Sequence, residues 1–196
     1  MRSLCVFCGS SPGFRPAYAD AARLLGRWLG ANGVRLIYGG GRTGLMGEVA
    51  GAALAAGGEV IGVMPRALVD REIAHTSLTE LHIVETMHQR KARMADLADA
   101  FLAMPGGFGT LDELCEILTW AQLHIHSKPC GLWNVEGYFD PLLALFDHGV
   151  AEGFLRPAHR ALVLADGSLP SLLDAMDAWR PEAALKWPDS RPPAEP

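Results

Sequence analysis

Short apolar runs alternate with longer amphipathic segments along almost the whole chain, and this alternation restricts the fold more than any other feature. The apolar runs begin at Leu4, Val34, Glu59, Leu81, Ala100, Cys130 and Ala161. Apolar residues three and four positions apart, as in amphipathic helices, mark the segments 18–33, 44–58, 87–100, 110–123, 138–153 and 168–180. Strands joined by such helices form a parallel sheet through crossover connections. The sequence therefore predicts an α/β fold, a doubly wound, Rossmann-like parallel sheet of about seven strands with helices on both faces.

The length and composition fit one domain. The 196 residues are 49% hydrophobic, which is enough for one sizeable core. We expect a single Rossmann-like domain over residues 1–180. Beyond Arg180 the periodic pattern gives way to "KWPDSRPPAEP", whose prolines and polar residues do not support a packed element. Residues 181–196 are therefore predicted to form a loose, proline-rich tail.

The charge and the N-terminal residues exclude several classes of protein. A net charge of -5 argues against a general nucleic-acid-binding protein, which would carry a basic face. The start of the chain, "MRSLCVFCGSS", has too short an apolar run for a signal peptide or a membrane span. We expect a cytoplasmic protein that binds neither nucleic acid nor membrane.

The cysteines and histidines give little support for a metal site. Cys5 and Cys8 form a Cys-x-x-Cys pair, but no second pair is present to complete four zinc ligands. Cys5 lies in an apolar run, so we expect both thiols to be small buried side chains. His124 and His126 are two residues apart and do not share one face of a helix. We predict no metal site.

Three glycine-rich segments each follow an expected strand. They read "CGSSPG" from Cys8, "YGGGRTGLMG" from Tyr38 and "PGGFGT" from Pro105. In open α/β sheets ligands bind at the carboxyl ends of the strands, where glycines let the backbone approach a phosphate and helix amides favour it. The sequence thus indicates a phosphorylated ligand, although tight strand-to-helix turns alone would also explain the glycines. The candidate phosphate or ribose contacts are Gly9, Ser10, Gly40, Gly41 and Gly44.

The second of these segments also contains Gly-x-Gly-x-x-Gly, at Gly39, Gly41 and Gly44. A dinucleotide-binding fold has this motif after its first strand and an acidic residue at the end of the next strand, where this chain has Met64 and Pro65. No Gly-x-x-x-x-Gly-Lys-Ser/Thr motif occurs either. We therefore expect neither a nicotinamide cofactor nor a P-loop nucleotidase.

Glu113 admits two interpretations. Thr110 and Glu113 form Thr-x-x-Glu before an apolar run, which is the pattern of a capping box at a helix start. If Leu111, Leu114 and Cys115 belong to the buried stripe, Glu113 points elsewhere and is able to face the mouth of the glycine loop. In the first helical turn the backbone amides would also favour its ionised form. The residues alone leave both interpretations open.

Arg90 and Lys91 lie early in the segment that leads to the run at Ala100. Cations close to a glycine-rich edge suit a phosphate, since arginine offers a bidentate fork and lysine a point charge. A solvated helix face is the alternative for both.

Several of these segments together resemble one known family. "PGGFGTLDE", from Pro105 to Glu113, is similar to the Pro-Gly-Gly-x-Gly-Thr-x-x-Glu motif of the Lonely Guy family, the cytokinin-activating phosphoribohydrolases. "ETMHQRKA", "CGSS" and "YGGGRTGLMG" add to the resemblance, which extends to about Ala178. Phe108 replaces a common tyrosine and Gln89 a common glutamate, both at tolerant places.

The resemblance implies hydrolysis of the N-glycosidic bond of a cytokinin riboside 5'-monophosphate, or of AMP, to the free base and ribose 5-phosphate. It implies that Arg90 and Glu113 are catalytic and that the protein is a homodimer. The implied substrate contacts are Glu72, Arg90, Lys91, Gly107, Phe108, Gly109, Thr110, Leu111, Asp112, Glu113 and Thr119. A non-catalytic carrier of a nucleotide or of the molybdenum cofactor, with the same fold, is the alternative.

Such proteins have also been labelled lysine decarboxylases. A decarboxylase that uses pyridoxal phosphate needs a lysine for the Schiff base. The chain offers only Lys91, Lys128 and Lys186; Lys186 lies in the tail, and Lys91 is better placed for a phosphate. We expect no cofactor.

Overall fold

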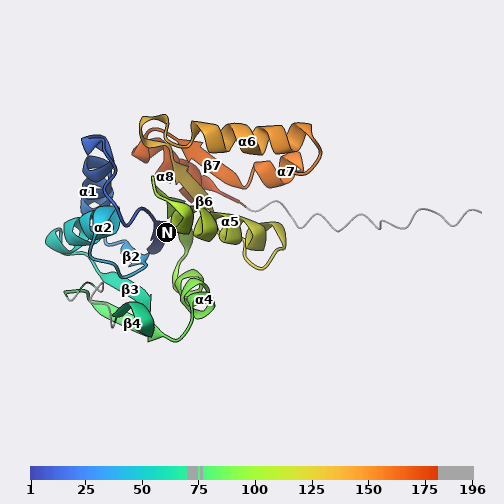
Figure 1. The fold of residues 1–196 in the computed structure, drawn as a ribbon. Coiled ribbons are helices and arrows are strands. Elements are labelled where there is room, and N and C mark those ends of the chain that lie inside the picture. Colours follow the sequence, from blue (N-terminus) through green and yellow to red (C-terminus); the bar gives the residue numbers. More distant parts are fainter. Residues whose placement is uncertain (70–74, 76, 181–196) are drawn as a thin grey trace, which may run out of the picture.

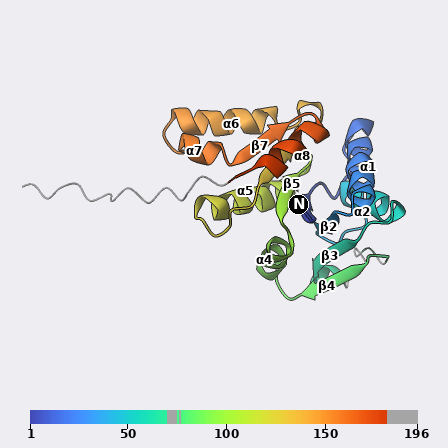
Figure 2. The same cartoon turned by 180° about the vertical axis from the view of Figure 1, so that it is seen from behind.

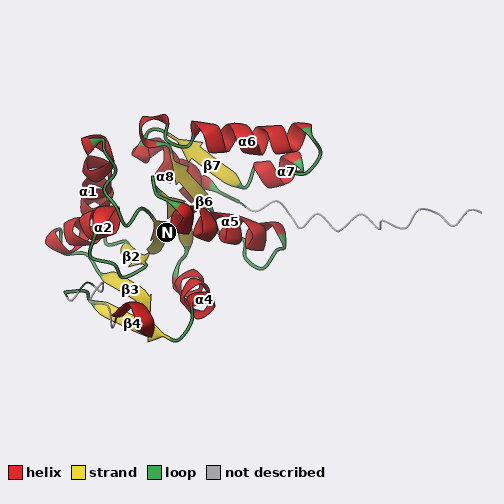
Figure 3. Ribbon diagram, in the orientation of Figure 1, coloured by secondary structure: helices red, strands yellow, loops and turns green. Residues whose placement is uncertain are grey.

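A seven-stranded parallel sheet forms the centre of the computed structural model, which describes residues 1–69, 75 and 77–180 (Figures 1 and 3). The strand order is β4-β3-β2-β1-β5-β6-β7, and each neighbouring pair is parallel. The strands are β1 Ser3–Phe7, β2 Arg35–Tyr38, β3 Val60–Pro65, β4 Glu80–Val84, β5 Ala100–Ala103, β6 Cys130–Trp133 and β7 Val163–Asp166. Each apolar run of the sequence contains one of them, so the predicted fold is confirmed.

Helices follow the strands as the sequence periodicity predicts. The six long ones are α1 Pro16–Ala31, α2 Gly44–Ala55, α4 Met87–Leu97, α5 Phe108–Gln122, α6 Asp140–Ala151 and α8 Leu169–Ala178. Three short helices were not predicted: α3 Arg66–Val69, η1 Val135–Gly137 and α7 Pro157–Arg160. With three or four residues each, they are too short to show a helical period in the sequence.

The helices cover both faces of the sheet (Figures 1 and 2). Leu4 and Val6 of β1 pack with residues of α1, α2 and α8, while Cys5 and Phe7 of the same strand pack with α4 and α5. Helix α6 packs with α5 over the β6 end of the sheet. Because successive side chains of a strand point to opposite faces, burial on both sides makes these strands continuously apolar. Cys5 and Cys8 are buried and free, as predicted.

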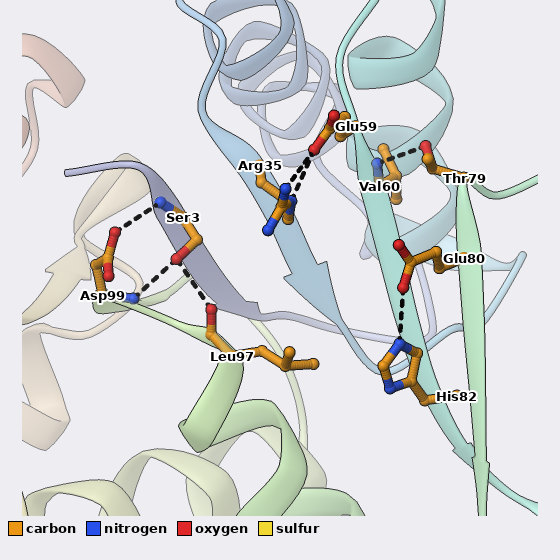
Figure 4. Close-up of polar contacts among 9 residues, drawn as sticks. All are labelled: Ser3, Arg35, Glu59, Val60, Thr79, Glu80, His82, Leu97 and Asp99. Atoms are coloured by element: carbon orange, nitrogen blue, oxygen red, sulfur yellow. Dashed lines mark hydrogen bonds and ion pairs between the residues drawn. The ribbon is translucent and has the colours of Figure 1, made fainter.

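Polar contacts join the amino ends of the strands to their neighbours (Figure 4). The Asp99 carboxylate accepts hydrogen bonds from the backbone N–H groups of Arg2 at 2.8 Å and Ser3 at 3.1 Å. The Ser3 hydroxyl donates to the Leu97 carbonyl at 3.0 Å. These bonds fix the start of β1 against the turn between α4 and β5, and so hold the register of the two central strands.

The direction of winding reverses between β1 and β5. From β1 the chain builds β2, β3 and β4 outward on one side, and it then returns to place β5 on the other side. The carboxyl ends of β1 and β5 therefore lie at the point where the strand order reverses, and ligands bind at this point in folds of this type.

The predicted tail over residues 181–196 lies outside the described residues, so the structure does not test it. Among the helices of the described ranges, none combines the length and the apolar character that a membrane crossing requires.

Candidate active site

The three glycine-rich loops meet at the carboxyl edge, as predicted. The Gly9 N–H donates to the Pro105 carbonyl at 3.0 Å, which ties the loop after β1 to the loop after β5. The Met46 N–H donates to the Gly9 carbonyl at 3.3 Å. Gly44 has a φ of +61°, and a Cβ on it would collide with the backbone of Ser10. Glycine is required there for both reasons.

Gly40 and Gly41 shape the loop after β2. Gly40 has a φ of +78°, and its carbonyl accepts a hydrogen bond from the His75 N–H at 2.9 Å. A Cβ on Gly41 would lie 2.7 Å from Cε of Met46. Both glycines thus fit the packing of the loop, and their contact with a phosphate or ribose stays a prediction.

Helix α5 begins three residues earlier than the Thr-x-x-Glu pattern predicts. Its N-cap is Gly107, no side chain caps it, and Thr110 already lies inside the helix. The predicted capping box of Thr110 and Glu113 is therefore wrong. Instead Thr110 is buried against Gly106, whose lack of a Cβ leaves room for the threonine side chain. The capping box of this region lies in α4, between Thr86 and Gln89.

The start of α5 faces open space. A Cβ added to Gly107 or Gly109 would meet no described atom within 4 Å, and the Phe108 side chain is 93% exposed. The first N–H groups of a helix have no acceptor within the helix, and they carry the positive end of its dipole. This open backbone is therefore suited to an anion.

Glu113 lies on the buried face of α5, in its second turn. Only 8% of the residue is exposed, and its buried neighbours on the helix include Thr110, Leu114 and Ile117. The prediction that Glu113 points away from the buried stripe is therefore wrong. Cys115, which was expected on that stripe, is exposed.

The Arg90 guanidinium is fixed from three sides. Its Nε donates to the Val63 carbonyl at the end of β3 at 3.1 Å, and its Nη1 lies 3.3 Å from Oε1 of Glu113. A Cβ on Gly39 would collide with Nη2. The two side chains of the ion pair are only 11% and 10% exposed. A largely buried ion pair thus lies close to the start of α5.

Burial raises the pKa of Glu113 above its ordinary value of 4.5, and the Arg90 charge acts in the opposite direction. Among the neighbouring charged groups, Arg90 is the main one that favours the ionised form. The expected contribution of the helix amides stays a prediction. Burial and the Glu113 charge together raise the pKa of the Cys8 thiol, so Cys8 stays neutral beside the pair.

Lys91 forms a second link between α4 and α5. Its ammonium lies 3.1 Å from the Asp112 carboxylate and 3.0 Å from the Glu116 carboxylate, and its side chain is 11% exposed. The predicted site residues Lys91 and Asp112 are thus brought next to the Arg90–Glu113 pair. The positive charge of Lys91, however, is compensated by two carboxylates.

One described residue among the predicted contacts, Thr119, is not brought into this cluster. Thr119 is exposed, and its hydroxyl donates to the Cys115 carbonyl at 2.7 Å. Six residues beyond Glu113, it lies roughly 240° around the helix and about 9 Å along it. Glu72 lies outside the described residues.

Two residues near the cluster did not stand out in the sequence. Gly39 belongs to the run of three glycines after β2, but only the structure shows that it makes room for Arg90. The Tyr138 hydroxyl donates to the Gly106 carbonyl from the far side of β6. Within the ranges that the structure describes, no group of three His, Cys, Asp or Glu residues is arranged to hold a metal ion.

Comparison with known proteins places the chain among characterised sequences. The family model described as "Possible lysine decarboxylase" matches residues 46–176. The chain is 52% identical over 180 residues to "Probable cytokinin riboside 5'-monophosphate phosphoribohydrolase LOGL9" of Oryza sativa subsp. japonica, covering 92% of this chain and 79% of the relative. It is 48% identical over 181 residues to "Cytokinin riboside 5'-monophosphate phosphoribohydrolase LOG7" of Arabidopsis thaliana, covering 92% and 83%.

Solved structures show the same fold at low sequence identity. The molybdenum cofactor carrier protein of Chlamydomonas reinhardtii has a TM-score of 0.66 and 20% identity, with 89% of this chain and 95% of that chain covered. The molybdenum cofactor binding protein of Rippkaea orientalis has a TM-score of 0.67 and 18% identity, with 89% and 94% covered. These two likenesses concern the fold alone. The family match and the sequence relatives show that the chain belongs to the Lonely Guy family, whose model carries the description "Possible lysine decarboxylase".

Proposed function

We propose that the protein hydrolyses the N-glycosidic bond of a cytokinin riboside 5'-monophosphate and releases the free base and ribose 5-phosphate. The observation that carries the proposal is the buried Arg90–Glu113 ion pair, which lies close to the open glycine backbone at the start of α5. The names of the relatives, which are about half identical to this chain, support the same reaction.

In this reaction the bond between the ribose C1' and the base nitrogen breaks, and its electrons leave with the base. The sugar acquires oxocarbenium character, so an adjacent carboxylate stabilises the developing positive charge and orients the water that attacks C1'. Glu113 takes this role. The water oxygen bonds to C1', and one of its protons ends on the base.

Arg90 has two roles in the proposed reaction. Its contacts with Val63 and Glu113 hold the carboxylate in place and favour its charged form. A guanidinium has five N–H donors, so others remain for the substrate phosphate or for the departing base. The start of α5, with the amides of Phe108 and Gly109 and the Thr110 residue, receives the phosphate, since a helix N-terminus binds anions.

The remaining site residues come from the family resemblance. Glu72, Lys91, Gly107, Leu111, Asp112 and Thr119 would complete the substrate contacts. Of these, Lys91 already binds Asp112 and Glu116, so a phosphate at Lys91 would compete with two carboxylates.

Wider properties of the protein belong to the same proposal. Residues 1–180 would act as one nucleotide-binding catalytic domain, with residues 181–196 as a tail. The protein would be a cytoplasmic homodimer, and AMP would be a second substrate.

Base release tests the proposal. Incubation with isopentenyladenosine monophosphate and with AMP should release the free bases, measured by liquid chromatography. Glu113→Gln should lower turnover on the order of a hundredfold or more, the usual effect of removing one such electrostatic group. Asp174→Asn, at an exposed position of α8, is the control and should retain activity. Full activity in Glu113→Gln would exclude Glu113 as the catalytic carboxylate.

A carrier that binds the nucleotide without cleaving it has the same fold. The buried Arg90–Glu113 pair at the carboxyl edge of the sheet favours hydrolysis, since a carrier has no need of a carboxylate beside the sugar. Tight binding of AMP without release of adenine by the unaltered protein would favour the carrier instead.

A further inference from the structure

A cavity of about 370 Å³ lies at the far end of α5 from the Arg90–Glu113 pair. Its wall includes the last turn of α5, the loop that leads to Cys130, α7 and Trp179. Residues of both α5 and α7 line it; Figures 1 and 2 show where these two helices lie. Leu123 follows Glu113 by ten residues, or about 15 Å along a helix axis. A ligand here would not occupy the proposed hydrolytic site.

Six basic residues line this cavity, and three of them are His124, Arg156 and His159. Burial lowers the pKa of His159, and the charges of Arg156 and His124 lower it further. None of the lining residues within the described ranges is an aspartate or a glutamate. The cluster therefore has no carboxylate in the cavity wall to balance it.

The backbone at His124 brings an imidazole to a place where glycine is usual. His124 ends α5 with a φ of 58°, and its N–H donates to the Ala121 carbonyl at 3.0 Å. Helices commonly end on a left-handed residue, which is most often glycine because it has no Cβ. A histidine there keeps the helix end but adds a polar side chain at the rim of the cavity.

The other basic residues of the wall, His126, Lys128 and Arg180, already make hydrogen bonds; Arg180 donates to the Asp177 and Trp179 carbonyls. The His126 ring lies 2.9 Å from the Ile117 carbonyl and accepts from the Lys128 N–H at 3.1 Å. The Lys128 ammonium donates to the Ala95 carbonyl at 2.7 Å. These bonds stabilise the loop. His124, Arg156 and His159 are left as the basic residues that face a ligand.

Aromatic groups supply the apolar side of the cavity. Phe154 lines it with 92% of its surface exposed, and Trp179 lines it from the end of α8. The indole Nε1 of Trp179 is buried and has no hydrogen-bond partner among the described residues. An unpaired buried donor costs about 1–3 kcal/mol, and an indole N–H only donates, so it requires an acceptor.

We propose that this cavity binds a small molecule in which an anionic group, either phosphate or carboxylate, is attached to a flat apolar ring. His124, Arg156 and His159 meet the anion, while Phe154 and Trp179 meet the ring. A volume of about 370 Å³ falls in the range of small-ligand sites. This site is independent of the proposed hydrolytic activity.

The indole N–H of Trp179 provides a local measurement. The chain has five tryptophans, and Trp179→Phe identifies its signal in a ¹H–¹⁵N spectrum of the full-length protein. Phenyl phosphate, benzoate and phenol are titrated separately in a buffer without multivalent anions. We expect a saturable shift of this signal with one or both anions, and the pair of results tells phosphate from carboxylate. No shift with either anion, or an equal shift with phenol, overturns the proposal.

Matched variants test the cationic cluster. Arg156→Gln and His159→Gln should each weaken binding by about tenfold or more, equivalent to 1.4 kcal/mol. Arg27→Gln makes the same change of charge on an exposed part of α1, on the opposite face of the sheet, and should leave the titration unchanged. If Arg27→Gln weakens binding as much as Arg156→Gln, the attraction is to net charge alone and the proposed site is wrong.

Discussion

At the scale of single residues, Glu113 illustrates how one side chain acquires a chemical role. The Thr-x-x-Glu pattern suggests a helix cap, yet the helix starts at Phe108 and buries Glu113 beside Arg90. Burial alone would favour the neutral acid, and the guanidinium restores much of the preference for the anion. Glu113 is thus a buried carboxylate paired with one opposite charge, an arrangement suited to stabilising a cationic sugar.

The pH dependence of turnover should reflect this balance. Because the pKa of Glu113 is raised, the carboxylate is lost at a higher pH than an ordinary glutamate, and turnover should fall as the pH drops through that raised value. The Asp112 charge contributes to the raised pKa, so Asp112→Asn should move the acid limb of the kcat profile to lower pH. An identical limb in both proteins would mean that another group, such as the substrate phosphate with a pKa of about 6, sets it.

Gly39 should be as sensitive as the ion pair itself. A Cβ there would collide with Arg90, so Gly39→Ala should displace the guanidinium and lower kcat/KM on the order of a hundredfold. Gly51→Ala is the matched control, since its Cβ meets no described atom within 4 Å in the interior of α2. That change should retain activity and stabilise the protein by roughly 0.5–1 kcal/mol in urea unfolding.

Normal turnover in Gly39→Ala would show that Arg90 does not need its observed position. Loss of activity with an unfolding free energy close to that of the unaltered protein would locate the effect at the site.

At the scale of elements, α4 and α5 act as a pair. Consecutive residues of α4, Arg90 and Lys91, each bind acidic residues of α5. Capping by Thr86 and Gln89 sets where α4 begins, and Gly107 sets where α5 begins. The spacing of these residues within each helix brings both ion-pair links to the carboxyl edge of the sheet.

Lys91→Met tests whether Lys91 serves this pairing or binds phosphate. The Lys91 charge lowers the pKa of Glu113, so its removal should move the acid limb of kcat to higher pH. We expect kcat at neutral pH to fall by about tenfold, the effect of about 1.4 kcal/mol, with little change in KM. Arg93→Met, an equal loss of charge at an exposed position of the same helix, should change neither constant. A large rise in KM with an unchanged acid limb would instead assign Lys91 to the phosphate.

At the scale of the whole molecule, large apolar side chains remain exposed on one side of the sheet. Along β4, α4 and the start of α5, exposed positions include Ile83, Met87 and Phe108. Exposed apolar groups that cluster on one side of a molecule often mark an interface with another protein. This supports the proposed homodimer.

Light scattering coupled to gel filtration should therefore give twice the mass of the chain. Ile83→Asp should shift the protein toward the monomer, because a buried charge without a partner opposes association. Leu24→Asp places the same charge at an exposed apolar position of α1 and should leave the mass unchanged. A monomeric mass for the unaltered protein would contradict the dimer, and a sixfold mass would indicate a hexamer.

The amino-acid pattern was sufficient to predict the alternation of strands and long helices, the parallel sheet and the glycine loops at its carboxyl edge. These features follow from local periodicity and from glycine's backbone freedom, which neighbouring residues determine. It also singled out Arg90 and Glu113 as candidates. It did not predict the start of α5 or the short helices, where local preferences are weak.

Only the tertiary structure decided which side of α5 is buried and what surrounds Glu113. Val63, Gly39 and Arg90 come from β3, the loop after β2 and α4, and they meet Glu113 only when the sheet has formed. The charge state of a buried carboxylate depends on such distant neighbours, because in a low-dielectric interior each nearby charge weighs heavily. Periodicity in the chain therefore determined the fold, while long-range packing determined the chemistry of its site.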